Sequence, residues 1–173
     1  MRTLALILAV GICLIGGGAS AEEHPDFSGV WLMDLNDPDS SPMAPLLEAQ
    51  GASWMERRAA DSVAVKQTIS QTEDAITIKA ESSLRTNTEV IRLDGTVEER
   101  VTDRLGKVQA RSYWAKDGKT VVTEMRYKTA DGKDAVWSTR RYLIDGGKKI
   151  RVDHLLEFAD GRKIRATRIL VKQ

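Results

Sequence analysis

The chain has 173 residues, with 26 lysines and arginines against 25 aspartates and glutamates, for a formal net charge of +1. Opposite charges are mixed along the sequence, so it lacks the concentrated basic face that nucleic-acid binding favours. With 42 % hydrophobic residues, the chain is long enough for one domain with a substantial core.

The first 21 residues have the pattern of a secretory signal peptide. Arg2 precedes the apolar run LALILAVGICLIGG, and the small residues ASA follow at 19–21, the order of a charged start, an apolar middle and a cleavage site. We predict cleavage after Ala21, a single domain over residues 22–173, and a periplasmic or secreted location. A retained membrane helix and a lipoprotein anchor are less favoured, because the run is short and glycine-rich and Ile12 precedes Cys13.

Cleavage would remove Cys13, the only cysteine of the chain. The mature protein would then have no disulfide, thiolate nucleophile or cysteine-ligated metal, so packing alone would have to stabilise it. Because no second apolar run approaches the length of a membrane span, we expect no integral membrane span after cleavage.

Short helices are predicted between a first strand, over residues 29–35, and the rest of the fold. The turn-rich loop NDPDSSPMAP follows this strand, and Pro45 then opens LLEAQGASWMERRAADS. Gly51 is expected to interrupt the helical segment, because glycine is unfavourable in the middle of a helix, so one or two short helices are expected. The apolar residues at roughly helical spacing are Leu46, Leu47, Trp54 and Met55.

From Val63 to the C-terminus, apolar and polar residues alternate with the period-two pattern of β-strands. Asp-Gly pairs separate the segments, and this dipeptide favours hairpin turns because both residues tolerate positive φ. The pairs begin at Asp94, Asp117, Asp131, Asp145 and Asp160. The predicted strands are 63–70, 75–82, 87–94, 96–102, 107–115, 119–128, 134–144, 148–158 and 162–172.

The sequence therefore predicts an all-β fold, with ten antiparallel strands in sequential order that curl into an up-and-down barrel and a short helical insertion after strand one. An open sheet would leave two exposed edges. On the first strand, Gly29 would let another backbone approach closely. Trp31 would be buried at one end of the barrel against an arginine of the final strands, such as Arg168.

Several short segments, taken in order, resemble the calycin superfamily, which includes the lipocalins and the fatty-acid-binding proteins. The Gly-x-Trp of FSGVW fits both groups. LLEAQGAS, TIKAESSLRTNTEVIRLDG and IRATRILVKQ are more similar to the helical lid, third and fourth strands, and last strand of the fatty-acid-binding proteins. The resemblance implies a barrel that carries a small hydrophobic or amphipathic, fatty-acid-like ligand. A separate bacterial lipocalin-like family of unknown function is an alternative.

The chain departs from the fatty-acid-binding proteins in two respects. Members of that family are typically cytosolic, whereas this chain carries an export signal. Their last strand usually reads Arg-x-Tyr, the anchor of a fatty-acid carboxylate, and here it reads Arg168-Ile169-Leu170. The resemblance implies that inward arginines on strands eight and ten, here Arg140 and Arg168, bind the carboxylate, with Tyr142 as a replacement for the phenol or as a packing residue.

Alternation places isolated polar side chains on the apolar inward faces of the predicted strands. Burying unpaired polar groups is costly, so we interpret them as the lining of a partly polar cavity around an amphipathic ligand. The predicted ligand-binding residues are Gln67, Ser112, Thr123, Tyr127, Ser138, Arg140, Tyr142, His154 and Arg168. Val97, Glu99 and Val101 are also predicted inward. A one-residue bulge would instead turn Arg140 outward, and Arg168 could stack on Trp31.

His154 lies on an apolar face, and we interpret it as a neutral, hydrogen-bonded core histidine, with a haem ligand as the alternative. The sequence has no metal-ligand cluster, phosphate loop or nucleophile elbow, so no cofactor or metal is expected. The leading hypothesis is a monomeric, exported carrier of a small hydrophobic ligand. One alternative is an enzyme that uses His154 with Glu99 or Tyr142 as an acid–base pair. Another is an envelope interaction module whose barrel is filled with side chains.

Overall fold

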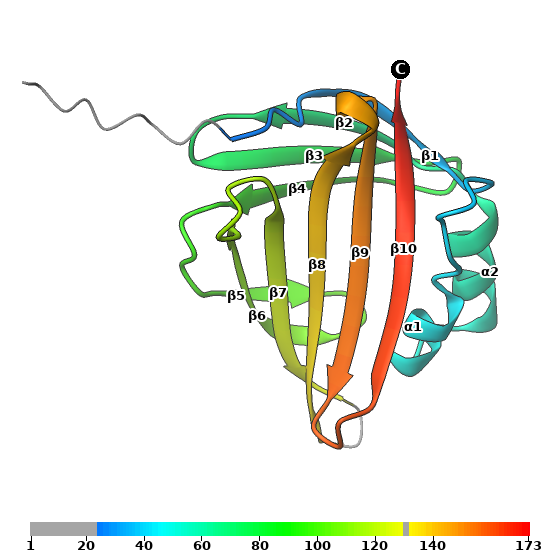
Figure 1. The fold of residues 1–173 in the computed structure, drawn as a ribbon. Coiled ribbons are helices and arrows are strands. Elements are labelled where there is room, and N and C mark those ends of the chain that lie inside the picture. The colour runs from blue at the N-terminus through cyan, green and yellow to red at the C-terminus, as the bar shows by residue number, and fades with distance from the viewer. Residues whose placement is uncertain (1–23, 130–131) are drawn as a thin grey trace, which may run out of the picture.

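The computed structural model describes residues 24–129 and 132–173, so the predicted signal peptide and its cleavage site lie outside the described residues. Figure 1 shows the strands and two α-helices of the described chain. The helices are α1 (Ala44–Ala49) and α2 (Trp54–Ser62), and a 3₁₀ turn, η1 (Asp145–Gly147), joins β8 to β9. The strands are β1 (Gly29–Asp34), β2 (Lys66–Gln71), β3 (Ala75–Glu81), β4 (Thr86–Arg92), β5 (Glu98–Thr102), β6 (Gly106–Trp114), β7 (Val121–Lys128), β8 (Asp134–Ile144), β9 (Lys149–Phe158) and β10 (Lys163–Lys172).

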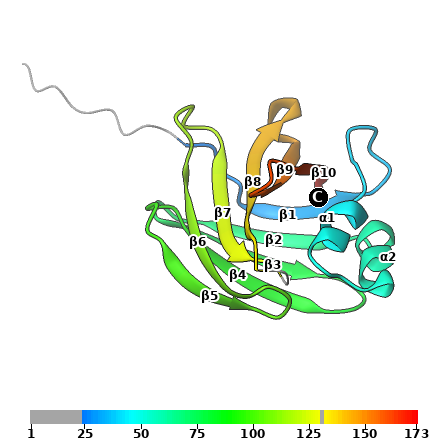
Figure 2. The same cartoon turned by 90° about the horizontal axis from the view of Figure 1, so that it is seen from below.

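All ten strands belong to one antiparallel sheet in the order β4-β3-β2-β1-β10-β9-β8-β7-β6-β5. Strands adjacent in sequence are neighbours in the sheet except at β4 and β5, and β1 also pairs with β10. Figures 1 and 2 show the sheet curling so that β1–β4 run across β7–β10. The predicted ten-stranded antiparallel fold with helices after the first strand is confirmed, in the form of a curled half-barrel.

The predicted strand limits are close to the observed ones. The largest difference is at the start of β2, predicted at residue 63 and observed at Lys66, because α2 continues to Ser62. At the turn between β8 and β9, Asp145 and Gly146 have φ of 51° and 62°. These are the positive values that make Asp-Gly favourable in a tight hairpin.

The helical insertion covers the part of β10 that β1 does not reach. β1 pairs with β10 only from Ile169 to Lys172, and the Ser41 N–H donates to the Thr167 carbonyl at 2.9 Å further along the same edge. Figure 2 shows α1 and α2 on this side of the sheet. No helix in the described ranges is both long and apolar enough to cross a membrane.

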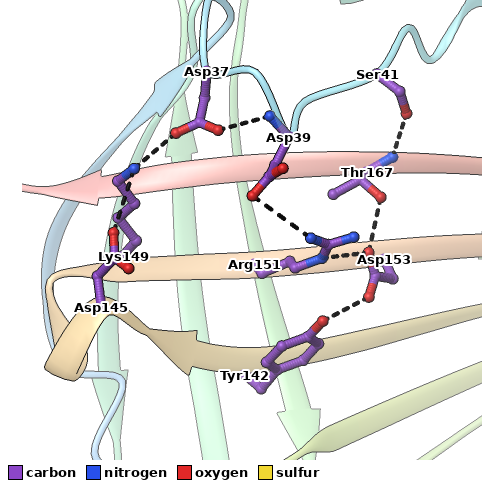
Figure 3. A network of polar contacts seen from close by, with 9 residues as sticks. All are labelled: Asp37, Asp39, Ser41, Tyr142, Asp145, Lys149, Arg151, Asp153 and Thr167. Carbon is purple, nitrogen blue, oxygen red and sulfur yellow. Dashed lines mark hydrogen bonds and ion pairs between the residues drawn. The ribbon is translucent and has the colours of Figure 1, made fainter.

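The loop between β1 and α1 is held to the outer face of the sheet by polar contacts (Figure 3). Lys149 Nζ lies 2.9 Å from Asp37 Oδ2, and the Thr167 N–H donates to Ser41 Oγ at 2.7 Å. Because these contacts join the loop to β9 and β10, they fix the position from which the helices begin.

Two apolar clusters occupy opposite ends of β7, β9 and β10. One, the upper cluster, consists of Phe27, Trp31, Ile69, Ile76, Ile78, Ile91, Leu93, Val121, Ile150, Val152 and Leu170. The other, the lower cluster, packs α1 against the sheet and consists of Met43, Leu46, Leu47, Ala52, Val108, Tyr127, Ala135, Leu156, Phe158 and Ala166. Hydrophobic burial at both ends stabilises the curl of the sheet. Between the two clusters, the inner surface carries other side chains.

The two edges of the sheet, β4 and β5, lie on either side of a gap that Arg100 bridges. Its Nη1 donates to Glu89 Oε1 at 2.9 Å, and its Nη2 donates to the Val90 carbonyl at 3.1 Å. Arg100 also pairs with Glu98 on its own strand. Side chains thus join the strands where no backbone ladder between β4 and β5 is present in the described chain.

The contacts of Arg100 correct the predicted orientation of β5. The prediction that Val97, Glu99 and Val101 face inward is wrong, because Val97 and Val101 are 57 % and 77 % exposed. Glu98 and Arg100 occupy the inner face, opposite Ala110 and Val108 of β6. The ion pairs of Arg100 compensate its charge there, so an apolar face was not needed to orient this edge strand.

Trp31 is fully buried, as the sequence predicts, but its neighbours differ from the prediction. Its indole Nε1 donates to the Phe27 carbonyl at 2.9 Å, and Lys172 Nζ lies 5.2 Å from the ring centroid. The expected partner, Arg168, is bonded to the helical insertion instead. Gly29 has φ 130°, and a Cβ there would lie 3.4 Å from the Lys172 side chain. Backbone conformation, rather than the close approach of another backbone, therefore explains this glycine.

Candidate ligand-binding site

A row of polar side chains crosses the inner face of β6–β9, between the two apolar clusters. Ser112 lies opposite Thr123, Thr123 opposite Thr139, and Thr139 opposite His154. Ser112 Oγ and Thr123 Oγ1 are 2.8 Å apart and share a hydrogen bond. The next inward row along the strands consists of Trp114, Val121, Arg141, Val152 and Arg168. The two rows bring hydroxyls, an imidazole and two guanidinium groups to one inner surface.

The inward face of β8 is one residue away from the predicted one. The predicted inward positions of Ser138, Arg140 and Tyr142 are wrong, because the uninterrupted ladder of β8 with β9 places all three on the outer face. The inward residues of β8 are Ala135, Trp137, Thr139, Arg141 and Leu143. The segment AVWSTRRYLI has apolar and polar residues in both alternating sets, so alternation alone does not determine which set faces inward.

Figure 3 shows the environment of Tyr142 on the outer face. Its hydroxyl donates to Asp153 Oδ2 at 2.9 Å, and Asp153 Oδ1 accepts from Arg151 Nε at 2.9 Å and from Thr167 Oγ1 at 2.8 Å. Burial acts to raise the pKa of Asp153, but the hydrogen bonds from Thr167, Arg151 and Tyr142 hold it below its ordinary value. Tyr142 therefore belongs to a structural network and does not replace a phenol in the interior.

Arg141 is the inward arginine of β8. Its Nη1 donates to Gln67 Oε1 on β2 at 3.1 Å. Strands β1, β10 and β9 separate β2 from β8 in the sheet, so this hydrogen bond crosses the interior. Within the described chain, no carboxylate lies within ion-pair distance of Arg141. Burial lowers the pKa of Arg141 to about 10, although Glu89 acts in the opposite direction.

His154 and Trp137 lie on the same inner surface as Arg141. Their ring centroids are 5.9 Å apart. Burial, together with the positive charges of Arg141 and Arg168, lowers the pKa of His154 to about 4, so the ring is neutral at pH 7. Among the described residues, neither His154 Nδ1 nor Trp137 Nε1 has a hydrogen-bond partner, and both atoms are fully covered. The neutral state agrees with the predicted core histidine, but the predicted hydrogen bond is missing at Nδ1.

Arg168 points inward from β10, and the helical insertion occupies its guanidinium. Nη1 donates to the Ser41 carbonyl at 2.6 Å, and Nη2 donates to the Ala60 carbonyl at 2.9 Å and to Asp61 Oδ1 at 2.5 Å. The Asp61 carboxylate also accepts from the Met43 and Ala44 N–H groups at the start of α1. Arg168 and Asp61 thus connect β10, α2 and α1.

The remaining predicted residues are spread over the inner surface. Gln67 contacts Arg141, Ser112 and Thr123 contact each other, and Tyr127 OH accepts a long hydrogen bond of 3.4 Å from Gln50 Nε2 near the end of α1. Sequence reasoning did not include Arg141, Trp137, Thr139 and Asp61. Because Arg140 and Arg141 are adjacent on a strand, the sequence indicates that one of the two faces inward. The sequence does not indicate the role of Asp61, because that role depends on contacts between segments far apart in the chain.

The lowered pKa of His154 predicts a pH dependence of stability. Between its ordinary value of 6.5 and about 4, the unfolded chain binds a proton on this histidine and the folded chain does not, so the free energy of unfolding should fall as the pH falls. At about 1.4 kcal/mol per pKa unit, the loss attributable to His154 is about 3 kcal/mol by pH 4. Urea unfolding of wild type and His154→Gln across this range should give curves that converge at low pH, and parallel curves would contradict the prediction.

Comparisons with known proteins show which folds this structure is similar to. No family model matches the chain, and no curated protein sequence matches it. Solved structures do match. A REP1-NXSQ fatty acid transporter gives a TM-score of 0.61 at 18 % identity, over 84 % of this chain and 95 % of its own. Apo Caenorhabditis elegans lipid binding protein 8 gives 0.63 at 14 %, over 85 % and 95 %. A Schistosoma mansoni fatty acid binding protein in complex with arachidonic acid gives 0.62 at 16 %, over 85 % and 96 %.

These likenesses, with the topology above, identify a fold of the fatty-acid-binding-protein type. At such identities they establish the fold and not the ligand. The ten antiparallel strands and the two helices between β1 and β2 match this fold.

Proposed function

We propose that this protein is an exported, monomeric binding protein that carries a small amphipathic ligand, with a fatty-acid-like molecule as the first candidate. Arg141 is the observation that carries the proposal. Its guanidinium points into the interior, its hydrogen bond goes to the neutral amide of Gln67, and no described carboxylate pairs with it. A buried charge without a counter-charge is costly. A ligand carboxylate would supply the counter-charge and match the fork of guanidinium donors.

Apolar side chains on the same inner surface as Arg141, toward the lower cluster, supply surface for a hydrocarbon tail. Met125, Trp137 and Ile164 are partly buried and pack against the lower cluster. Burial of a tail against such side chains contributes affinity in proportion to the apolar area covered. The names of the structural neighbours support this ligand class, since they are a fatty acid transporter, a lipid binding protein and a fatty acid binding protein.

The same family resemblance predicted Arg168 as the carboxylate ligand. The helical insertion already provides two carbonyl oxygens and a carboxylate oxygen to its Nη atoms. A ligand would have to displace these acceptors to reach it. Arg141 is therefore the better candidate for the head group while the helices stay in place.

The proposal is tested by comparing Arg141→Met with Arg140→Met. We expect Arg141→Met to weaken the binding of octadecanoic acid by about 1.5–3 kcal/mol, the scale of a hydrogen bond to a charged group. Arg140→Met should leave binding unchanged, because Arg140 is exposed on the outer face. Calorimetric titration of the purified exported protein measures both, and N-terminal sequencing of that protein should begin at Glu22.

Two outcomes would contradict the proposal. One is the absence of saturable binding to the wild-type protein. The other is an equal loss of affinity in both variants, which would mean that the inward position of Arg141 is irrelevant. Circular dichroism and a thermal unfolding curve of Arg141→Met check that the variant is folded before its affinity is compared.

A further inference from the structure

Among the covered polar atoms of the described chain that have no hydrogen-bond partner, Trp137 Nε1 and His154 Nδ1 belong to neighbouring residues of the inner surface. Buried polar groups are nearly always paired, so each exception needs an explanation. The two rings are 5.9 Å apart, on neighbouring strands. The nearby hydroxyls of Ser112 and Thr123 already bond to each other at 2.8 Å. The described chain therefore supplies a partner to neither atom, and a ligand oxygen would reach them only where the side chains that cover them move aside.

The chemistry of the two atoms restricts what such a group can be. An indole N–H can only donate, and a neutral imidazole has one donor and one acceptor nitrogen. Burial and the positive charges of Arg141 and Arg168 lower the pKa of His154 and hold its ring neutral. The same two charges disfavour a cationic ligand group there. A second carboxylate is disfavoured as well, because it would be buried close to the head group on Arg141. A hydroxyl or a ketone oxygen meets the requirement, because it accepts from the indole and bonds to the imidazole without carrying charge.

The position of the two atoms relative to Arg141 restricts where that oxygen lies on the ligand. Thr139, opposite His154, is two residues from Arg141 along β8, and Trp137 is four residues away on the same face. At about 3.4 Å per residue, these spacings are about 7 Å and 14 Å. Trp137 packs against the lower cluster, so a chain that runs from Arg141 toward that cluster passes both rings at its middle and not at its head.

We propose that the Trp137–His154 pair is a second polar subsite, and that the preferred ligand is a long-chain carboxylic acid with a hydroxyl or oxo group in mid-chain. The inference rests on the proposed function, because it takes Arg141 as the site of the acid head group. It adds the class of acid, since an unsubstituted acid would leave both buried atoms without partners and an oxygenated one would satisfy them.

The test compares octadecanoic acid with derivatives that carry a hydroxyl or oxo group at successive mid-chain positions, titrated into the purified protein. For one range of positions, we expect the derivative to bind about tenfold more tightly than octadecanoic acid, the effect of one to two net hydrogen bonds. Trp137→Phe and His154→Phe should each reduce this preference to about twofold or less. The preference is the ratio of the two affinities within one variant, so a change in the affinity for octadecanoic acid itself does not enter the comparison.

Trp114→Phe is the matched control. Trp114 Nε1 is also covered and unpartnered among the described residues, but it lies beside the upper cluster. This variant should retain the full preference, which separates the subsite from a general effect of removing a buried indole N–H. As a second readout, the indole proton resonance of Trp137 should shift when the preferred derivative is titrated into the wild-type protein. It should not shift when octadecanoic acid is titrated into His154→Phe.

The outcomes separate the inference from the proposed function. If octadecanoic acid binds through Arg141 and every derivative binds equally or more weakly, the subsite inference is overturned and the carrier function stands. A preference that survives in both Trp137→Phe and His154→Phe overturns it as well. If no acid binds to the wild-type protein, both fail together.

Discussion

Replacement of Arg168 with leucine is expected to lower the free energy of unfolding by about 3 kcal/mol, the lower end of the range for breaking a buried ion pair. The Arg168 side chain is 7 % exposed and that of Asp61 is 25 % exposed, so the pair is largely removed from water. The substitution leaves the Asp61 carboxylate without its counter-charge. It also leaves the carbonyls of Ser41 and Ala60 without their donor. Urea unfolding, followed by circular dichroism, measures the loss.

Arg165→Leu is the control for Arg168→Leu. Arg165 is on the same strand with its side chain exposed, so this change should alter stability by no more than about 0.5 kcal/mol. Addition of Asp61→Asn to Arg168→Leu should recover part of the loss, because an amide keeps an acceptor for the N–H groups of Met43 and Ala44 without a buried charge. Equal stability of Arg165→Leu and Arg168→Leu would show that the helices are held by apolar contacts alone.

The contacts of Arg168 also explain why the helical insertion is not a separate element. Asp61 caps α1, whose own N-cap residue, Met43, has no side-chain acceptor. One guanidinium on β10 thus fixes both helices against the sheet. A loss of this pair should therefore destabilise the helices before the strands, which are joined by backbone ladders.

The fold could be predicted because its determinants are local. Asp-Gly turns and period-two alternation set the hairpins, and Pro45 with the apolar spacing after it set the helices. Sequential hairpins then leave little choice of strand order. The curl was predicted from the cost of exposed edges, but closure is incomplete, because β4 and β5 remain as the two edges of the sheet.

The site was predicted only in part, because strand phase depends on packing. On β9 and β10 one face is clearly apolar, and His154 and Arg168 lie on the inner face as expected. On β8 both alternating sets contain an arginine and an aromatic residue, so the choice between Arg140 and Arg141 was decided by tertiary contacts. Those contacts are Tyr142 with Asp153 outside and Arg141 with Gln67 inside.

The second large effect is expected for Trp31→Ala, which should lower the free energy of unfolding by about 3–5 kcal/mol. The ring is fully buried in the upper cluster, so truncation leaves a cavity and also removes the donor to the Phe27 carbonyl and the surface under Lys172. Trp54→Ala is the control, since Trp54 is 63 % exposed and should cost no more than about 0.5 kcal/mol. Denaturation midpoints that coincide for the two variants would contradict the role of Trp31. If Trp31→Ala lowers the denaturation midpoint strongly and Lys172→Met lowers it by much less, the effect belongs to the buried ring and not to the cation that covers it.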